Sequence, residues 1–561
     1  MSAKDANTYD AIVVGSGMSG GWAAKELTER GLKTLVLERG RHVEHIKDYP
    51  TADKDPWNLP YGNELTVRDQ EEYFIQKKVY NFKQDTKHFF VKDTDHPYQQ
   101  IKPFNWMRGY QTGGKSLMWS RHCFRWSDLD FEANAREGIG IDWPIRYRDI
   151  APWYDHVEEF VGVSGENAGL AQLPDGRLLP PLEMNCLERH VKARIADHYR
   201  DRRMIVARVA VLTRPHNGRG RCRSRNMCAR GCPYGAYFSS NSATLPAASK
   251  TGNMTLRPFS IVHSLIYDAE KKRATGVRVI DAETKKTYEY FARIIFLNAG
   301  TLNTTLILMN STSSHFPEGF ANSSGVLGHY LMDHQEAGGA IGVYDGFQDK
   351  YYRGRKPNGM YIPRFRNLID KRADYLRGFA YEAYSGRENW QRGFSRLGMG
   401  ADFKNEMARP GAWSMLLVGY GECLPDDKNR VTLNKDERDQ WGLPTLNLDM
   451  RYGENELTMR KDMQASAEEM LAVAGLKEIR SLQLEPVPGG CIHEMGTARM
   501  GHDPKTSVLN RFNQCWDALN VFITDGSCMV STACQNPSLT YMALTARACD
   551  YAVQELKRGN L

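Results

Sequence analysis

A glycine-rich turn between two apolar segments is the feature of the first forty residues that most constrains the fold. In "YDAIVVGSGMSGGWAAKELTERGLKTLVLERG", the run from Ala11 to Val14 is typical of a buried parallel strand. Gly15, Gly17 and Gly20 then form a G-x-G-x-x-G turn, which allows a tight bend, close approach of a pyrophosphate and close helix–strand packing. "KTLVLE" predicts the next strand and ends in Glu38, whose carboxylate can accept hydrogen bonds from a ribose. The unit predicts a bound dinucleotide, either NAD or FAD.

Length and composition narrow the class of protein. A chain of 561 residues exceeds one ordinary core, so we expect two or more domains. With 41% hydrophobic and 25% charged residues it resembles globular proteins, and no apolar run reaches the length of a membrane span. A net charge of +7 is slight for this length and gives no reason to expect a nucleic-acid partner. The N-terminus lacks the basic and apolar regions of a signal peptide, so we expect no export signal of its own.

A second glycine-rich segment imitates a phosphate loop. "GYQTGGKS", residues 109–116, matches G-x-x-x-x-G-K-[ST] and would predict a nucleotide triphosphatase. A phosphate loop follows a buried strand and begins a helix, whereas "KPFNWMR" precedes this one and no clear helical period follows it. No apolar strand ends in an aspartate that could hold magnesium. The context therefore argues against a phosphate loop.

Further motifs follow in order along almost the whole chain. They are "DWPIRYRDIAPWYDHVEEFVGVSG" from Asp142, "IIFLNAGTLNTTLILMNS" from Ile294, "GHYLMDH" from Gly328, "HEMGTARMG" from His493 and "NVFITDGSCMVSTACQNPSLTYMALTARA" from Asn520. Together with the N-terminal turn, they resemble the glucose–methanol–choline oxidoreductases, flavoproteins that oxidise alcohols. The resemblance implies FAD as the dinucleotide.

The resemblance also implies the fold. It is an α/β fold in which a Rossmann-like FAD-binding domain is interleaved with an α+β substrate domain that carries an antiparallel sheet. We expect the FAD-binding domain to take residues 1–48, 100–125, 190–335 and 486–561, and the substrate domain residues 49–99, 126–189 and 336–485. Two local patterns agree: "KKRATGVRVIDAETKKTYEYFARIIFL" predicts a hairpin that returns to a buried strand. "NELTMRKDMQASAEEMLAVAGL" predicts an amphipathic helix stopped by glycine.

Cofactor contacts follow from the same resemblance. "TGGKSLMW" corresponds to the loop that lies along the flavin, which implies contacts from Gly113, Gly114 and Ser116. Asp525–Gly526 is expected to meet the flavin through backbone amides. Some relatives tether the flavin to a histidine in this loop, and Met118 stands at that place here. We therefore expect non-covalent FAD.

Oxidation of an alcohol by a flavin needs a base for the hydroxyl proton. His493 in "CIHEMGT" suits this task because imidazole titrates near neutral pH, and it matches the active-site histidine of the family. Its family partner is a second histidine or an asparagine, and Asn536 in "CQNPS" takes that position. The amide of Asn536 can orient the substrate oxygen while His493 stabilises the developing alkoxide.

Three cysteines form a segment that ordinary members of the family do not need. Cys222, Cys228 and Cys232 lie in "RGRCRSRNMCARGCPYGAYFSS", with five and then three residues between them and a proline after the third. A disulfide would leave one thiol over, and structural zinc typically takes four ligands. The C-x3-C-P ending is that of bacterial ferredoxins, and the spacing resembles the catalytic subunits of bacterial FAD-dependent sugar dehydrogenases. We expect an iron–sulfur cluster in the loop 219–235. Three ligands suit a three-iron, four-sulfide cluster, which the resemblance favours, or a four-iron cluster completed by a remote residue. Zinc and free thiols are the alternatives.

Five arginines crowd the same segment: Arg219, Arg221, Arg223, Arg225 and Arg230. They suit either a solvated basic loop or a positive surface that raises the potential of the cluster and steers an electron acceptor.

These observations predict an FAD-dependent dehydrogenase that oxidises a secondary hydroxyl of a sugar or glycoside, with the 3-hydroxyl among the candidates. The resemblance implies a cytochrome c-type acceptor and a small companion subunit that carries the export signal, which places the pair in the periplasm; a cytoplasmic enzyme would also lack a signal. The alternatives are an oxygen-using oxidase of the same family, a nucleotide triphosphatase, and a flavin-bearing electron-transfer or assembly protein without turnover.

Overall fold

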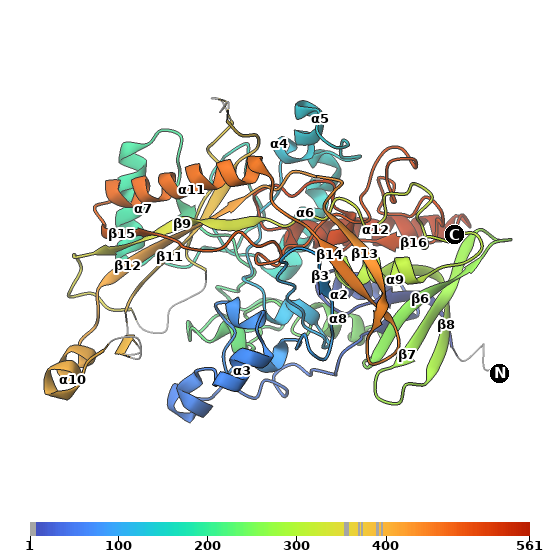
Figure 1. Ribbon diagram of the computed structural model, residues 1–561, viewed down its shortest axis with the longest axis horizontal. Coiled ribbons are helices and arrows are strands. Elements are labelled where there is room, and N and C mark those ends of the chain that lie inside the picture. The colour runs from blue at the N-terminus through green and yellow to red at the C-terminus, as the bar shows by residue number, and fades with distance from the viewer. Residues whose placement is uncertain (1–6, 353–357, 369–370, 372–373, 389–391, 394–396) are drawn as a thin grey trace.

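The computed structural model describes residues 7–352, 358–368, 371, 374–388, 392–393 and 397–561. Figure 1 shows two large sheets at opposite ends of the molecule, with β6, β7 and β8 at one end and β9, β11 and β12 at the other. Both ends of the chain lie on the side of the first sheet. The α/β fold expected from the sequence is confirmed.

The first sheet is the dinucleotide-binding one. Within the described residues it has seven strands in the order β5-β2-β1-β8-β7-β6, with β16 also paired to β8. Their bounds are β1 Thr8–Val14, β2 Thr34–Leu37, β5 Met254–Arg257, β6 Ser260–Asp268, β7 Arg273–Asp281, β8 Thr287–Leu297 and β16 Val521–Ile523. β1 is parallel to β2 and β8, and β7 and β8 form the predicted antiparallel hairpin. The predicted βαβ unit is confirmed, because α2 (Met18–Glu29) connects β1 to β2.

Helices from distant parts of the chain cover this sheet. α2 packs against α8 (Thr244–Lys250) and α12 (Ser538–Lys557), and α12 packs against α6 (Tyr147–Val161). α12 has buried residues along most of its length, which explains the apolar and small residues of "SLTYMALTARACDYAVQELK". The C-terminal segment therefore belongs structurally with the N-terminal one.

The second sheet is mainly antiparallel. In the described part of the chain its six strands run in the order β15-β9-β12-β11-β10-β4. Their bounds are β4 Ile205–Val206, β9 Gln335–Tyr344, β10 Met360–Ile362, β11 Phe379–Arg387, β12 Trp413–Gly421 and β15 Lys477–Ser481. β4 joins this sheet although its segment was expected to lie with the FAD-binding domain, and α7 (Cys186–His198), just before it, packs against α11 (Glu454–Val473) and β11.

α11 is the predicted amphipathic helix, and it lies across β9 and β12 (Figure 1). It ends at Val473, and Gly475 follows in the left-handed conformation that glycine favours. A Cβ on Gly419 would lie 2.1 Å from the Met463 sulfur and one on Gly338 would lie 2.6 Å from it. Glycine on the sheet therefore lets the methionines of the helix pack directly on the backbone.

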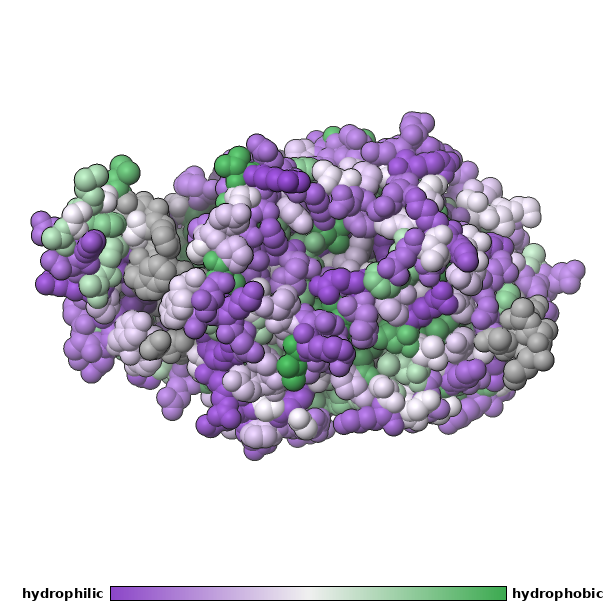
Figure 2. All heavy atoms as spheres, turned by 90° about the horizontal axis from the view of Figure 1, so that it is seen from below, coloured by the Kyte–Doolittle hydropathy of each residue, from purple (hydrophilic) through white to green (hydrophobic). Residues whose placement is uncertain are grey.

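A small third sheet packs beside α9 (Thr301–Asn310). It contains β3 Gln99–Gln100, β13 Arg430–Arg438 and β14 Pro444–Asp449, and α9 packs against β13 and β14. The remaining α-helices in the described residues are α3 Val67–Glu72, α4 Asp128–Phe131, α5 Ala133–Glu137 and α10 Gly400–Ala408. No helix in the described ranges is long and apolar enough to cross a membrane. Figure 2 shows one face on which hydrophilic residues dominate and hydrophobic ones are scattered.

Candidate functional site

One cavity of about 300 Å³ brings together most of the residues predicted from the sequence. Its walls include Val14 of β1 and Leu37 of β2 from the first sheet, and Glu336 of β9 and Tyr420 of β12 from the second. The predicted site residues that line it are Gly15, Gly17, Glu38, Gly114, Ser116, His493, Asp525, Gly526 and Asn536. Segments that are far apart in the sequence thus contribute to one site.

The glycine turn leaves room for a ligand where the sequence pattern requires it. Gly15 has φ +92°, and a Cβ there would lie 2.3 Å from the Asn298 carbonyl oxygen. Gly20 lets the helix pack closely on the turn, because a Cβ at this position would lie 1.9 Å from the Gly15 carbonyl oxygen. A Cβ on Gly17 would meet nothing within 4 Å, and no side chain caps the start of α2 there. The free N–H groups of α2 therefore suit a phosphate group at this point.

Glu38 follows β2 and is buried at the edge of the cavity. Its carboxylate accepts hydrogen bonds from the Ser16 amide (3.1 Å), the Ser16 hydroxyl (2.5 Å) and the Gly40 amide (3.0 Å). Burial raises the pKa of Glu38, against the effect of these bonds. Gly113 lies behind the cavity wall, where its amide donates to the Ser16 hydroxyl at 2.9 Å. Glu38 and Gly113 thus both stabilise the glycine turn through hydrogen bonds with Ser16.

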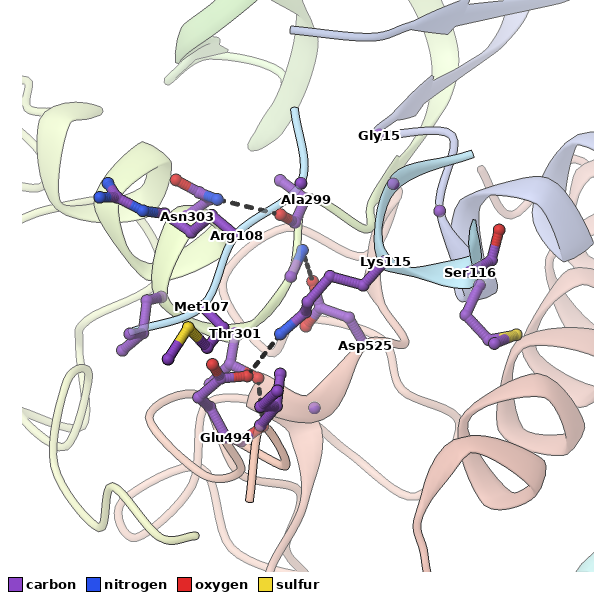
Figure 3. Close-up of a pocket in the computed structure, with 18 of the residues that line it drawn as sticks. Gly15, Met107, Arg108, Lys115, Ser116, Ala299, Thr301, Asn303, Glu494 and Asp525 are labelled. Atoms are coloured by element: carbon purple, nitrogen blue, oxygen red, sulfur yellow. Dashed lines mark hydrogen bonds and ion pairs between the residues drawn. The ribbon is translucent and has the colours of Figure 1, made fainter. Parts of the chain in front are cut away.

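The loop expected to lie along the flavin forms the 3₁₀ turn Gly114–Leu117 in place of the α-helix that a phosphate loop begins. Lys115 extends across the cavity to Glu494, with 2.7 Å between Nζ and Oε2 (Figure 3). Asp525 accepts hydrogen bonds from the Gly300 amide at 2.9 Å and the Thr304 hydroxyl at 2.5 Å, so its carboxylate holds the start of α9. Met118 borders the cavity at the place expected for a tethering histidine.

Several buried polar atoms that belong to cavity-lining residues have no partner among the described residues. They include Asn298 Nδ2, Asn310 Nδ2, Glu494 Oε1 and Tyr541 Oη. Buried polar atoms in native proteins ordinarily have a hydrogen-bond partner. These orphan atoms, with the free start of α2, fit a large polar ligand such as a dinucleotide.

His493, which lines the cavity, contacts a second histidine, the buried His334. His493 Nδ1 lies 2.8 Å from Nδ1 of His334, and His334 Nε2 lies 2.6 Å from the Ala533 carbonyl oxygen. A carbonyl only accepts, so His334 Nε2 carries a hydrogen. Burial lowers the pKa of His334 to about 4, so its ring is neutral and its Nδ1 accepts a hydrogen bond from His493. This leaves Nε2 of a neutral His493 as an unprotonated base.

The charge state of His493 agrees with that tautomer. Burial, the neighbouring His334 and the Lys115 ammonium hold the pKa of His493 well below its usual value. Asp333 holds the loop that carries His493. Its carboxylate accepts hydrogen bonds from the backbone amides of Gly489 (2.8 Å) and His493 (3.0 Å). The base is therefore both neutral and held in position before any substrate arrives.

Asn536 is connected to a buried acid that the sequence did not single out. Glu382 of β11 accepts hydrogen bonds from the Asn536 amide, the Tyr384 hydroxyl and His122 Nδ1. Burial raises the pKa of Glu382, but these partners, His122 first, outweigh it and the pKa is lowered. An ionised carboxylate accepts only, so the amide nitrogen of Asn536 faces Glu382. Its second N–H and its Oδ1 are left for a substrate oxygen.

Glu336 of β9 is another acid that borders the cavity. Burial and the carboxylates of Glu382 and Asp333 raise the pKa of Glu336 to about 8. Its carboxyl is therefore mostly protonated at neutral pH and can donate a hydrogen bond. His334 is the last residue of the motif "GHYLMDH", and Glu336 lies two residues after it. Glu382 is a lone acid in the apolar strand "FAYEAY", which is a usable signal.

The three cysteines of the loop 219–235 are free, partly buried and close enough to interact. Burial raises the pKa of the Cys222 thiol, and the charges of Cys228 and Cys232 raise it further. Among the described residues, no group of three His, Cys, Asp or Glu side chains is arranged to hold a single metal ion. The ligands of a cluster bind different irons, so their sulfurs need not meet at one point. The iron–sulfur cluster stays a prediction.

The five arginines of this loop do not form one exposed patch. Arg219 and Arg230 are buried, and Arg230 pairs with Asp85. Arg225 is partly buried and pairs with Asp53 at 3.2 Å. Arg221 and Arg223 are the exposed members. Most of this positive charge therefore anchors the loop.

Comparison with known proteins identifies matches across the chain. Two family models described as GMC oxidoreductase match residues 9–336 and 425–545. The chain is 27% identical to a 2-methyl-1,2-propanediol dehydrogenase of Mycolicibacterium austroafricanum, over 97% of this chain and 95% of that one. It is also 27% identical to a fructose dehydrogenase large subunit of Gluconobacter japonicus, over 98% of each. A formate oxidase structure from Aspergillus oryzae RIB40 shares the fold, with a TM-score of 0.63, 14% identity and coverage of 98% and 99%.

Proposed function

The chain belongs to the GMC oxidoreductase family, and we propose that it is an FAD-dependent dehydrogenase that oxidises a secondary hydroxyl of a sugar or glycoside. The observation that carries the proposal is the neutral His493 with a free Nε2, in the same cavity as Asn536 and the glycine turn. Relatives named for a diol and for fructose support a hydroxyl-bearing substrate. His122 and Glu336, which line the cavity, and the buried Glu382, which binds His122, support one with several hydroxyls.

In this proposal, His493 and Asn536 bind the reacting hydroxyl. His493 Nε2 takes the hydroxyl proton, and Nδ1–H stays bonded to His334, which stabilises the imidazolium that forms. The amide of Asn536, held by Glu382, positions the same oxygen. FAD, when bound, supplies the acceptor for the hydride from the carbinol carbon. Gly15, Gly17, Glu38, Asp525 and the loop around Gly114 would hold it.

The FAD is expected to be bound without a covalent link, because Met118 lines the cavity where a tethering histidine would stand. Acid precipitation of the purified protein should release the yellow colour into the supernatant. An absorption spectrum of the two fractions measures this directly. Flavin that stays with the pellet would contradict the proposal.

Single electrons are proposed to leave through an iron–sulfur cluster held by Cys222, Cys228 and Cys232. Arg121 supports this route, because it lines the cavity and its charge also interacts with Cys228. The acceptor is proposed to be a cytochrome of the c type, with a small companion subunit that carries both proteins to the periplasm. The relative named as a large subunit supports the companion.

The proposal is tested by the visible spectrum of the purified protein. Glucose or a methyl glucoside, added without oxygen, should bleach the flavin band. Admission of oxygen should restore the band slowly and a c-type cytochrome should restore it quickly. Rapid restoration by oxygen alone would favour the oxidase of the same family, and a flavin that no sugar or polyol bleaches would favour an electron-transfer role without turnover.

A further inference from the structure

We propose that His122 is a second binding point for the substrate, which takes a hydroxyl other than the one that is oxidised. The inference rests on the proposed function and defines its substrate class as molecules with at least two hydroxyl groups. No motif in the sequence had pointed to this residue. His122 stands directly after the flavin loop, in "MWSRHCFRW".

The imidazole of His122 is buried with one nitrogen used and one free. The residue is 1% exposed, and its Nδ1 forms a hydrogen bond with Glu382. Nε2 is also buried and has no partner among the residues that the structure describes. The residue lines the cavity, and its charge reaches far enough to lower the pKa of His493. A ligand atom in the cavity is therefore the partner that Nε2 lacks.

Glu382 determines what Nε2 can do. Its carboxylate only accepts hydrogen bonds, so Nδ1 of His122 carries the hydrogen in this pair. Nε2 then accepts a hydrogen bond when the ring is neutral and donates one when the ring is charged. A hydroxyl group serves as partner in both states, because it can donate and accept. An alkyl or aryl group would leave Nε2 unsatisfied.

The position of His122 relative to the reacting hydroxyl follows from the shared acid. Glu382 binds both Asn536 and His122, so the residue that orients the reacting oxygen and the residue with the free nitrogen lie on one network. A substrate held by His493 and Asn536 therefore presents neighbouring atoms to His122. In a sugar or other polyol, the neighbouring carbons carry hydroxyl groups.

Two substitutions distinguish the contributions of Nδ1 and Nε2 of the His122 ring. In His122→Asn the amide can replace Nδ1 toward Glu382 while the group at Nε2 is lost. In His122→Gln the longer side chain can restore a polar atom near Nε2. Since loss of one hydrogen bond costs about 0.5–1.5 kcal/mol, H122N should weaken binding up to about tenfold, and H122Q should recover part of it.

Binding is measured in protein whose turnover is slowed by the His493→Ala substitution. Calorimetry with a methyl glucoside compares His493→Ala with the His493→Ala, His122→Asn double variant, each loaded with FAD. In the otherwise wild-type protein, H122N should raise KM for the glucoside more than it lowers kcat, and leave KM for cyclohexanol, with one hydroxyl, unchanged. The matched control is His156→Asn, which removes another imidazole that pairs with a buried glutamate (Glu26, 2.8 Å), on α6 and outside the cavity.

Equal affinity of the two His493→Ala proteins for the glucoside would overturn the inference, as would equal losses for glucoside and cyclohexanol. If H122N does not retain FAD, H122Q and H122L are compared in its place. H122L lacks a polar atom near Nε2, so it should bind the glucoside more weakly than H122Q does. Equal affinity of the two folded proteins for the glucoside would overturn the inference. Failure of the proposed function looks different, because no polyol would then bleach the flavin of the wild-type protein.

Discussion

Replacement of His493 by alanine is expected to slow reduction of the flavin by substrate on the order of 10² to 10⁴-fold, with FAD still bound. The loss arises because His493 Nε2 is the free, neutral base of the cavity, while the glycine turn that would hold the dinucleotide is a separate part of its wall and is unchanged. Stopped-flow absorbance measures the rate, and the spectrum of the purified variant reports bound FAD. Asn536→Ala should be milder, because it removes orientation and leaves the base.

The same base predicts a pH profile. Only neutral His493 can take the hydroxyl proton, and its pKa is held well below 6.5 by burial, His334 and Lys115. The reduction rate should therefore persist as pH falls through 6.5, where an ordinary imidazole would lose it. His334→Ala removes the partner that selects the tautomer and should give an intermediate rate with an altered acid limb. A His493→Ala enzyme that is reduced at the normal rate would remove this histidine from the mechanism.

Replacement of Cys228 by serine is expected to abolish transfer of electrons to the natural acceptor. Wild-type protein should contain iron and acid-labile sulfide, near three irons per chain if the resemblance to the sugar dehydrogenases holds. The variant should lose both, because Cys222, Cys228 and Cys232 are the cysteines of this loop and no spare thiol lies within it. Reduction of the flavin by sugar should continue, because His493 and Asn536 are unchanged. Small dyes that reach the flavin should still be reduced.

Cys186→Ser is the matched control, since Cys186 is a free cysteine on α7 outside the loop. It should keep the iron and the rate of cytochrome reduction. Loss of cytochrome reduction with normal reduction of the flavin would indicate that the cluster transfers electrons. A cluster with only a structural role would, when lost, destabilise the protein and slow both reactions. Full cytochrome reduction by a Cys228→Ser protein that contains no iron would show that electrons do not pass through the cluster.

Much of the fold could be predicted because it depends on local patterns. The run before Gly15, the glycine turn and the strand before Glu38 predicted a βαβ unit, which the parallel pairing of β1 and β2 confirms. Apolar periodicity predicted α11 and the β7–β8 hairpin. By contrast, β4 is two residues long and carries no such pattern, and it joins the second sheet by pairing with a distant strand, β10. Short edge strands follow tertiary contacts more than propensity.

The sequence by itself determined the residue types of the site: the glycines that admit a phosphate, the histidine that can act as base and the amide beside it. Only the tertiary structure decided their chemical state. Which nitrogen of His493 is free depends on His334, and how Asn536 faces the substrate depends on Glu382. His334 is 159 residues from His493 and directly precedes β9, and Glu382 lies on β11. Both strands belong to the second sheet and not to the sheet beside the glycine turn. Protonation and orientation are set by burial and by neighbours in space, which local sequence patterns do not contain.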